Sequence, residues 1–408
     1  MATSSRKPIL ISGGGLSALL LGKALLRASI PFLLFERDAS ISFRAQGYRL
    51  RLSAGGLDAI EGVLGPEGFQ KFWDICGKTG GVGLAVVNAV TGETIEQMNP
   101  AKDAESEKTE GLPRPREQLG SRDGKIVGIS RGDMRKAFMT GCESFIHWSH
   151  RVTGYELTSS GVRAIFADGS KSVEGEMLIG GEGIYSKVSK QLSEGKLKTY
   201  DTGARAIHGQ APTSAFKGLG EGVWRMIDES KSNGKVFVMT NIRSGDMDNP
   251  EVEFGWTMGA TPDVIQPPNN DYAIIGKPAA DMAKDLIKDW HPRFQPMFQQ
   301  MVDSESSFWK ITCSTPTGVP EWKNEPRVTL IGDAVHAMTP AGGNGANTAL
   351  KDSALLGRLL AEAGGYKDGV TLAYEKEMRV YASEAVAASY DQAKGMFGFT
   401  FDENTKTI

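Results

Sequence analysis

The feature that most constrains the fold is a run of three glycines close to the N-terminus. Residues 13–15 are all glycine, and they separate the apolar run 9–11 from a stretch rich in Leu and Ala over 16–29. A second apolar run follows at 32–35. This order predicts a strand, a tight turn, a helix and a second strand, which together form a βαβ unit in a parallel sheet with a right-handed crossover.

The turn has the composition of a dinucleotide-binding fingerprint. Gly13 allows the sharp bend, Gly15 lets the backbone approach a pyrophosphate, and Ala18 is small enough for the helix to pack closely on the sheet. The helix N-terminus offers free N–H groups to the phosphates, and Glu36 ends the second strand where an acid can reach a ribose hydroxyl. The alternative is a glycine turn that only permits tight packing. The predicted cofactor contacts are Gly13, Gly15, Leu16, Ser17, Ala18, Glu36 and Arg37.

A second glycine-rich segment lies in the last quarter of the chain. The apolar run 328–331 predicts a buried strand that delivers Asp333 to its carboxyl edge, where an acid can accept hydrogen bonds from ribityl or ribose hydroxyls. The loop 340–347 leads into a helix predicted from Thr348, whose first N–H groups would face the N1/C2 region of a flavin. The alternative for Asp333 is an N-cap or turn residue. The predicted contacts here are Asp333, Gly343, Gly345, Ala346 and Asn347.

A nucleotide site built from both ends of a chain needs an extended cofactor, which favours FAD and hence a redox enzyme. Between the two ends, residues 202–266 carry short alternating segments with turn signals between them, which favour an antiparallel sheet in a separate domain. Helices are predicted over 131–145, 278–301 and 348–394, and a further buried strand over 177–179.

The predicted fold class is therefore α/β. It comprises a Rossmann-like FAD-binding domain, a second, smaller substrate domain with an antiparallel sheet, and C-terminal helices. We assign 1–70, 120–195 and 310–408 to a discontinuous FAD-binding domain, 71–119 to a solvated excursion, and 196–309 to the substrate-binding domain.

Composition argues against several classes of partner. The formal net charge is −3, so the chain has no basic footprint for nucleic acid. Cys76, Cys142 and Cys313 are widely spaced without a CxxC pair, which argues against a disulfide framework or a metal site and favours a reducing, cytoplasmic location. No unbroken apolar stretch is long enough to span a bilayer, so we expect no membrane anchor.

Three motifs together resemble one family, the class A flavoprotein monooxygenases with the para-hydroxybenzoate hydroxylase fold, fungal natural-product members in particular. They are the N-terminal fingerprint with Glu36, the segment 180–186, and Asp333 with the loop that follows it. The motifs occur in the family's order over nearly the whole chain. The middle motif has Glu182 where the family usually has Asp, and Gly181 where it usually has Ala, which bears on the pyrophosphate contact made there.

The resemblance implies further cofactor contacts. Gly183 belongs to the middle motif, and Arg131 corresponds to an arginine that contacts the flavin nucleotide. Arg44 and Gly47 match a loop that packs beside FAD and can meet NADPH. The alternative for Arg131 and for Arg44 is a surface arginine with no partner.

The resemblance also implies a catalytic role for Arg205, which would lie over the flavin and orient the substrate or stabilise a developing oxyanion. The alternative is an edge-strand arginine that faces solvent. His336 follows Asp333 closely, and we interpret it as structural rather than as a general base.

The reaction implied by the resemblance has two halves. NADPH or NADH reduces FAD, and a flavin C4a-hydroperoxide formed with O2 then transfers one oxygen atom to an aromatic or polycyclic small molecule. We expect a monomer or a homodimer. The alternatives are a flavin-dependent reductase or dehydrogenase of the same superfamily, which would turn over without O2, and a flavin-holding protein with no turnover.

Overall fold

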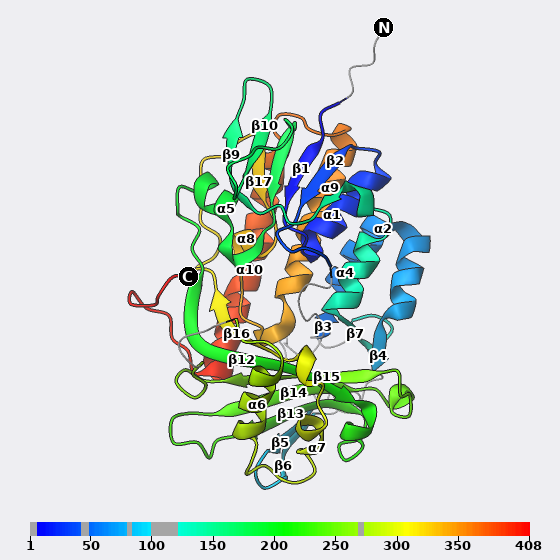
Figure 1. The fold of residues 1–408 in the computed structure, drawn as a ribbon, viewed down its shortest axis with the longest axis vertical. Helices are drawn as coiled ribbons and strands as arrows, with labels where there is room; N and C mark the ends of the chain where they lie inside the picture. The colour runs from blue at the N-terminus through cyan, green and yellow to red at the C-terminus, as the bar shows by residue number, and fades with distance from the viewer. Residues whose placement is uncertain (1–5, 42–48, 80–83, 99–120, 268–272) are drawn as a thin grey trace, which may run out of the picture.

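The structure is a computed structural model that describes residues 6–41, 49–79, 84–98, 121–267 and 273–408 of the 408-residue chain. A parallel sheet covered by helices forms the upper part of Figure 1, and a larger sheet lies across the lower part. The helix α10 (Val370–Phe397) runs from one to the other.

The parallel sheet confirms the predicted βαβ unit. Its order is β17-β11-β1-β2-β8, so that β1 lies between β2 and β11, and every adjacent pair is parallel. The strands β1 and β11 are buried along their whole length, as expected for a sheet with both faces covered. The five strands are β1 (Ile9–Ser12), β2 (Phe32–Phe35), β8 (Ile146–His147), β11 (Met177–Gly180) and β17 (Val328–Leu330).

The helices α1 (Leu16–Arg27) and α9 (Gly345–Ala363) pack on each other at very short range. A Cβ atom built on Gly357 of α9 would lie 2.5 Å from the Cβ of Ala24 in α1. The hydroxyl of Ser353 donates a hydrogen bond of 2.7 Å to the carbonyl of Ser17. This contact places the starts of both helices at the same edge of the sheet, although more than three hundred residues of chain separate the two hydrogen-bonded residues.

Smaller elements surround the parallel sheet. The strands β3 (Arg49–Leu52), β7 (Ile126–Ser130) and β4 (Gly77–Thr79) form an antiparallel sheet, and β9 (Val152–Leu157) pairs with β10 (Val162–Phe166). The remaining helices here are α2 (Ala54–Ile75), α4 (Arg131–Met139), α5 (Lys187–Leu192) and α8 (Asp333–His336). A helix is predicted over 131–145. The observed helix, α4, ends earlier, at Met139, and a 3-10 turn follows it.

The larger sheet has the order β16-β12-β15-β14-β13-β5-β6 and is antiparallel except between β13 and β5. Its strands are β5 (Leu84–Asn88), β6 (Thr94–Met98), β12 (Tyr200–Pro212), β13 (Gly222–Asp228), β14 (Val236–Ile242), β15 (Glu253–Ala260) and β16 (Ser307–Cys313). The antiparallel strands predicted within 202–266 correspond to β12, β13, β14 and β15.

The two faces of this sheet have different partners. The back face carries Ile207 and Met258, which share a buried cluster with residues of α6 (Lys277–Leu286) and α7 (Pro296–Gln299). The front face carries Ala206 and Phe237, which share a cluster with Phe397 of α10 and with Ala341 of the glycine-rich loop. The front face therefore turns toward the predicted cofactor segment.

Two predictions about these elements need correction. The helical stretch predicted over 278–301 is interrupted, because it contains two helices, α6 and α7, separated by a loop. The predicted excursion 71–119 includes β5 and β6, which extend the larger sheet beyond β13. Pairing with β13, far along the chain, creates these strands, so local composition did not reveal them. Residues 99–119 of the excursion lie outside the described residues, and the domain division stays a prediction.

The short 3-10 helices are η2 (Glu143–Phe145), η3 (Gly183–Tyr185), η4 (Thr213–Phe216), η5 (Ser244–Asp246), η7 (Asp303–Glu305) and η8 (Ala341–Gly343). In the described part of the chain, no helix combines the length and the apolar character needed to cross a bilayer.

The contact between α1 and α9 predicts opposite effects for two Gly→Ala substitutions. Gly62 in α2 has nothing within 4 Å of a built Cβ, so Gly62→Ala should raise the free energy of unfolding by about 0.5–1 kcal/mol. Gly357→Ala should lower it by about 1–3 kcal/mol, because the methyl group would force the helices apart. Urea unfolding measures both; equal stabilisation by the two substitutions would contradict the observed packing.

Candidate functional site

The three motifs identified in the sequence meet at the carboxyl edge of the parallel sheet. Gly13 has φ +97°, and a Cβ there would lie 2.4 Å from the carbonyl oxygen of Gly181. Gly332 has φ +63°, and a Cβ there would lie 2.8 Å from the hydroxyl oxygen of Ser17. Both positions require glycine for conformation and for space. The fingerprint turn, the middle motif and the Asp333 segment are therefore in direct contact.

The fingerprint turn opens outward at Gly15. A Cβ built there meets no atom within 4 Å, and the same is true at Gly183, which has φ +79°. Gly15 caps α1 without a side-chain hydrogen bond, and the first turn of α1 contains no acid that could occupy its positive end. Leu16, Ser17 and Ala18 are buried, so only their backbone can meet a ligand. An uncapped helix start beside open space fits a pyrophosphate.

A buried arginine that the sequence pattern did not reveal fixes this turn. Arg135 of α4 donates to the carbonyl oxygen of Gly14 through Nε at 3.1 Å and Nη2 at 2.9 Å, and to the carbonyl of Ile41 at 3.3 Å. It is 2 % exposed. Nothing in the local sequence distinguishes it from a surface arginine of a helix. Its charge lies next to the place where phosphates are expected, which favours an anion there.

Glu36 lies at the end of β2 as predicted. Its carboxylate accepts hydrogen bonds from the backbone N–H of Gly14 at 2.5 Å and of Asp38 at 2.8 Å, which fixes its position beside the turn. Each carboxylate oxygen has a further lone pair that can accept a ribose hydroxyl. Arg37 is exposed and lies 3.9 Å from Asp38. The predicted contacts Arg44 and Gly47 lie outside the described residues.

Asp333 begins α8 and remains exposed to solvent although protein surrounds it closely. Desolvation by this protein raises the pKa of Asp333, and the charges of His336 and Arg131 oppose the rise. Arg131, at the start of α4, is therefore near enough to act on Asp333, as the predicted site requires. Because the carboxyl faces solvent, a ligand that filled this space would complete its desolvation. An exposed acid in such surroundings fits a hydroxyl-bearing cofactor chain.

The helix α9 begins at Gly345 directly after the glycine-rich loop. Asn344 at its N-cap makes no side-chain hydrogen bond, and its first turn contains no acid. The side chain of Asn347 donates to the carbonyls of Arg51 and Gly343 and accepts from the N–H of Ser53. The amide of Asn347 thus holds the loop, including Gly343, against β3. The cofactor contacts of Gly345, Ala346 and Asn347 stay a prediction, in which their backbone N–H groups would be the donors.

His336 is completely buried and bonded to Asp352 of α9, with 2.7 Å between Nε2 and Oδ2. Burial disfavours the charged imidazole, but the carboxylate of Asp352 outweighs that effect and raises the pKa of His336. Asp352 also accepts from the N–H of Gly332 at 2.6 Å and from the hydroxyl of Tyr381 at 2.7 Å. This network joins α8, α9 and α10, as expected for a structural histidine.

Glu182, the departure from the family's middle motif, accepts a hydrogen bond of 3.0 Å from the N–H of Val188 in the first turn of α5. Burial raises the pKa of Glu182 despite this bond. The carboxylate is thus directed at the protein's own helix start.

Arg205 lies in neither of the two places expected for it. The strand β12 is not an edge, because it pairs with both β15 and β16. Arg205 is in register with Ala260 of the back-face cluster, two positions before Ile207 of the same cluster. Alternation along a strand therefore assigns it to the back face, away from Ala341.

The positive charge of Arg205 already has an anionic partner within the protein, Asp201. Its guanidinium contacts both carboxylate oxygens of Asp201, at 2.7 and 3.3 Å. Burial opposes the ionisation of Asp201, but hydrogen bonds from Arg205, Gly203 and Lys310, with the charge of Arg205, together lower the pKa of Asp201. A register irregularity between Asp201 and Arg205 brings the two side chains together, and this was invisible in the sequence. The structure therefore gives no support to the catalytic role predicted for Arg205.

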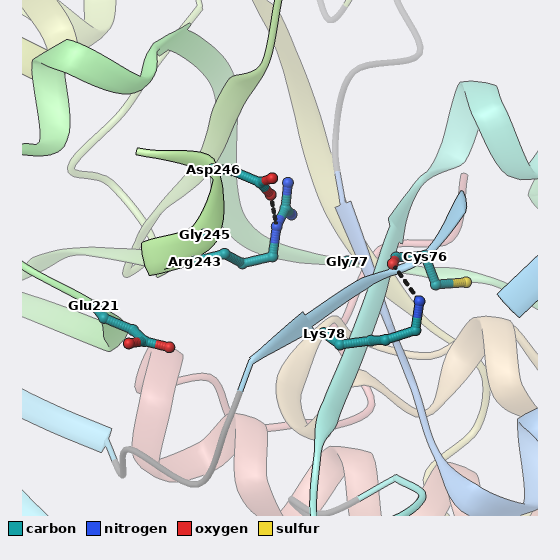
Figure 2. A pocket seen from close by; sticks show the side chains of 7 residues that line it. All are labelled: Cys76, Gly77, Lys78, Glu221, Arg243, Gly245 and Asp246. Atoms are coloured by element: carbon teal, nitrogen blue, oxygen red, sulfur yellow. Dashed lines mark hydrogen bonds and ion pairs between the residues drawn. The ribbon is translucent and has the colours of Figure 1, made fainter. Parts of the chain in front are cut away.

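Figure 2 shows a pocket of about 220 Å³ between β4 and the larger sheet, lined by Cys76, Gly77, Lys78, Glu221, Arg243, Gly245 and Asp246. In this pocket Arg243 pairs with Asp246, and Lys78 donates to the carbonyl of Cys76. None of the predicted site residues lines it. We therefore place the site at the three converging motifs.

Comparison with known proteins shows the family to which the chain belongs. A family model described as "FAD binding domain" matches residues 132–389. The chain is 27% identical to a dual O-methyltransferase/FAD-dependent monooxygenase of Phaeosphaeria nodorum, in an alignment that covers 97% of this chain and 47% of that protein. It therefore spans about half the length of that relative. It is 26% identical to an FAD-dependent monooxygenase of Penicillium aethiopicum, with 94% and 91% covered.

Among solved structures, the chain is similar to HpxO of Klebsiella pneumoniae complexed with FAD and uric acid. The TM-score is 0.73 at 18% identity, over 96% of this chain and 89% of that one. At this identity the likeness shows a common fold.

The two glycines of the turn predict separable effects. Gly15→Ala should leave folding unchanged but weaken FAD binding at least about tenfold, since the methyl group would occupy the open space. Gly13→Ala should lower the free energy of unfolding by about 1–3 kcal/mol through backbone strain. Flavin absorbance titrations and urea unfolding distinguish these outcomes. Unchanged flavin affinity in Gly15→Ala would contradict the pyrophosphate placement.

The Asp352 network predicts a large loss of stability when its acceptor is removed. Asp352→Ala leaves two buried donors and the half-buried hydroxyl of Tyr381 without this partner and should lower the free energy of unfolding by about 3–5 kcal/mol. Arg358→Ala on the exposed side of α9 is the control and should change it by about 0.5 kcal/mol or less. Urea unfolding at matched flavin content tests this, and similar values for both variants would refute it.

Proposed function

The chain belongs to the FAD binding domain family, and we propose that it is an FAD-dependent monooxygenase. It would use NADPH or NADH and insert one oxygen atom of O2 into an aromatic or polycyclic small molecule. The observation that carries the proposal is the joint opening of two uncapped helix starts, α1 and α9, beside the exposed carboxyl of Asp333.

The residues at the sheet edge would hold the cofactor in order along its length. The backbone of Gly15 and the first turn of α1 would bind the pyrophosphate, and Glu36 would accept a ribose hydroxyl. Asp333 would accept hydrogen bonds from the ribityl chain, with Arg131 nearby. The first N–H groups of α9 would face the electron-rich side of the flavin ring. FAD supplies electron transfer from the nicotinamide and the activation of O2.

The chain itself supplies binding, orientation and exclusion of water. Ala341, next to the loop that would hold the ring, packs in one buried cluster with Phe237 of the front face. A substrate would therefore lie on the front face, next to this cluster. The names of both relatives and the FAD and uric acid in the HpxO complex support a small-molecule oxidation.

Turnover tests the proposal. The purified chain should oxidise NAD(P)H in a substrate-dependent manner across an aromatic panel and transfer isotopically labelled oxygen from O2 to a product. Asp333→Ala, which should retain less FAD, should lose activity in proportion to its flavin content. Turnover without O2 would instead indicate a reductase or dehydrogenase, and a protein that cannot be loaded with FAD would overturn the proposal.

A further inference from the structure

The strand register of the larger sheet defines two successive rows of side chains across its front face. The first row contains Ala206 and Phe237, which pack with Phe397 and Ala341. Because side chains on one face recur every second residue, the next row follows directly from the pairing. It consists of His208, Thr257, Met239, Arg225, Val86 and Glu96.

This second row lies between two contacts that connect the front face to the rest of the molecule. On one side is the first row, covered by the end of α10. On the other side Asn241, two residues beyond Met239, bonds to the hydroxyl of Thr79 in β4 at 2.9 Å. The second row is therefore next to the contact with Ala341 and within reach of a molecule held there.

Arg225 is the strongly basic member of this row, and an aromatic side chain supports its guanidinium. The guanidinium carbon lies 5.5 Å from the ring centroid of Phe237, its diagonal neighbour on β14. Phe237 in turn packs on Phe397 of α10, with 5.2 Å between ring centroids. The position of Arg225 is therefore tied to the same cluster that contains Ala341.

Arg225 differs in its surroundings from two other arginines beside the larger sheet. Arg205 pairs with Asp201, and Arg243 pairs with Asp246. Among the residues that the structure describes, no carboxylate forms an ion pair with Arg225, and its Nε is buried without a hydrogen-bond partner. Glu96, in the same row beyond Val86, acts only through its charge.

A half-buried guanidinium that forms no ion pair is unfavourable to the extent that it loses hydration without gaining a partner. Burial accordingly lowers the pKa of Arg225, although an arginine stays charged in proteins. Such a group is retained at a cost in stability, which a ligand anion can offset by supplying two parallel hydrogen bonds to the planar fork.

We propose that Arg225 binds the anionic group of the substrate, a carboxylate or an ionised phenol on an aromatic ring. This inference rests on the proposed function and narrows its substrate class to aromatic anions. Phe237 and Met239 flank the guanidinium and provide apolar surface for the ring that carries the anion. Arg225 is thus a binding residue that would set the orientation of the substrate on the front face.

A pair of ligands that differ only in charge tests the inference. Naphthoate and naphthamide have the same ring, so calorimetric titration of the flavin-loaded chain isolates the contribution of the anion. We expect naphthoate to bind at least about tenfold more tightly than naphthamide. Arg225→Gln should abolish this preference by weakening naphthoate alone, and Arg225→Lys should keep part of it.

The control is Arg163→Gln, which removes the same charge from the β10 hairpin, where Arg163 donates to the carbonyl of Ser172. It should leave the preference intact. Equal affinities of the wild-type chain for the two ligands, or no binding of either, would overturn the inference, as would an unchanged preference in Arg225→Gln.

The wild-type comparison needs no variant, so a misfolded variant cannot hide the result. Flavin content and NAD(P)H oxidation are measured on the same preparations. If the protein is flavin-loaded and active but shows no preference for naphthoate, the role of Arg225 is rejected and the monooxygenase proposal stands. A preference for naphthoate in a protein that shows no oxygen transfer supports the role of Arg225 and rejects the monooxygenase.

Discussion

Two backbone segments approach each other so closely at Gly13 and Gly181 that no side chain fits between them. This contact sets the end of β1 against the end of β11, and Gly332 makes a similar approach to Ser17. The start of α1, which opens outward at Gly15, is thereby held beside the middle motif and the Asp333 segment. The nucleotide site thus depends on the absence of side chains at a few positions, since any Cβ there would separate the segments that form it.

A second set of interactions keeps these segments from shifting. Arg135 holds the carbonyl of Gly14, and Asp352 receives hydrogen bonds from α8, α10 and the N–H of Gly332. These groups are buried, and a buried polar network is stable only when its members are satisfied. The protein's own hydrogen bonds therefore hold the segments of the site in their positions.

The cofactor side could be predicted from the sequence because its signals are local. A glycine turn between a strand and a helix, with Glu36 at the end of the next strand, can be recognised in one short stretch of sequence. Arg135 could not be predicted, because an arginine in a helix becomes special only when a distant loop lies against it. Arg205 and Arg225 could not be told apart either, since strand parity and a register irregularity decide which face each occupies. The strands β5 and β6 were missed for the same reason, because their partner is β13.

The helix α10 limits how the space between the two sheets could be redesigned for other reactants. Its 28 residues correspond to a length of about 42 Å. Near its start Tyr374 donates to the carbonyl of Leu330 in β17, and at its end Phe397 packs on Phe237 of the larger sheet. A continuous helix attached at both ends acts as a spacer of fixed length, so the two sheets cannot separate to admit a bulkier molecule. Redesign for larger or smaller reactants would therefore proceed by trimming or extending individual side chains such as Met239, with the scaffold dimension held constant.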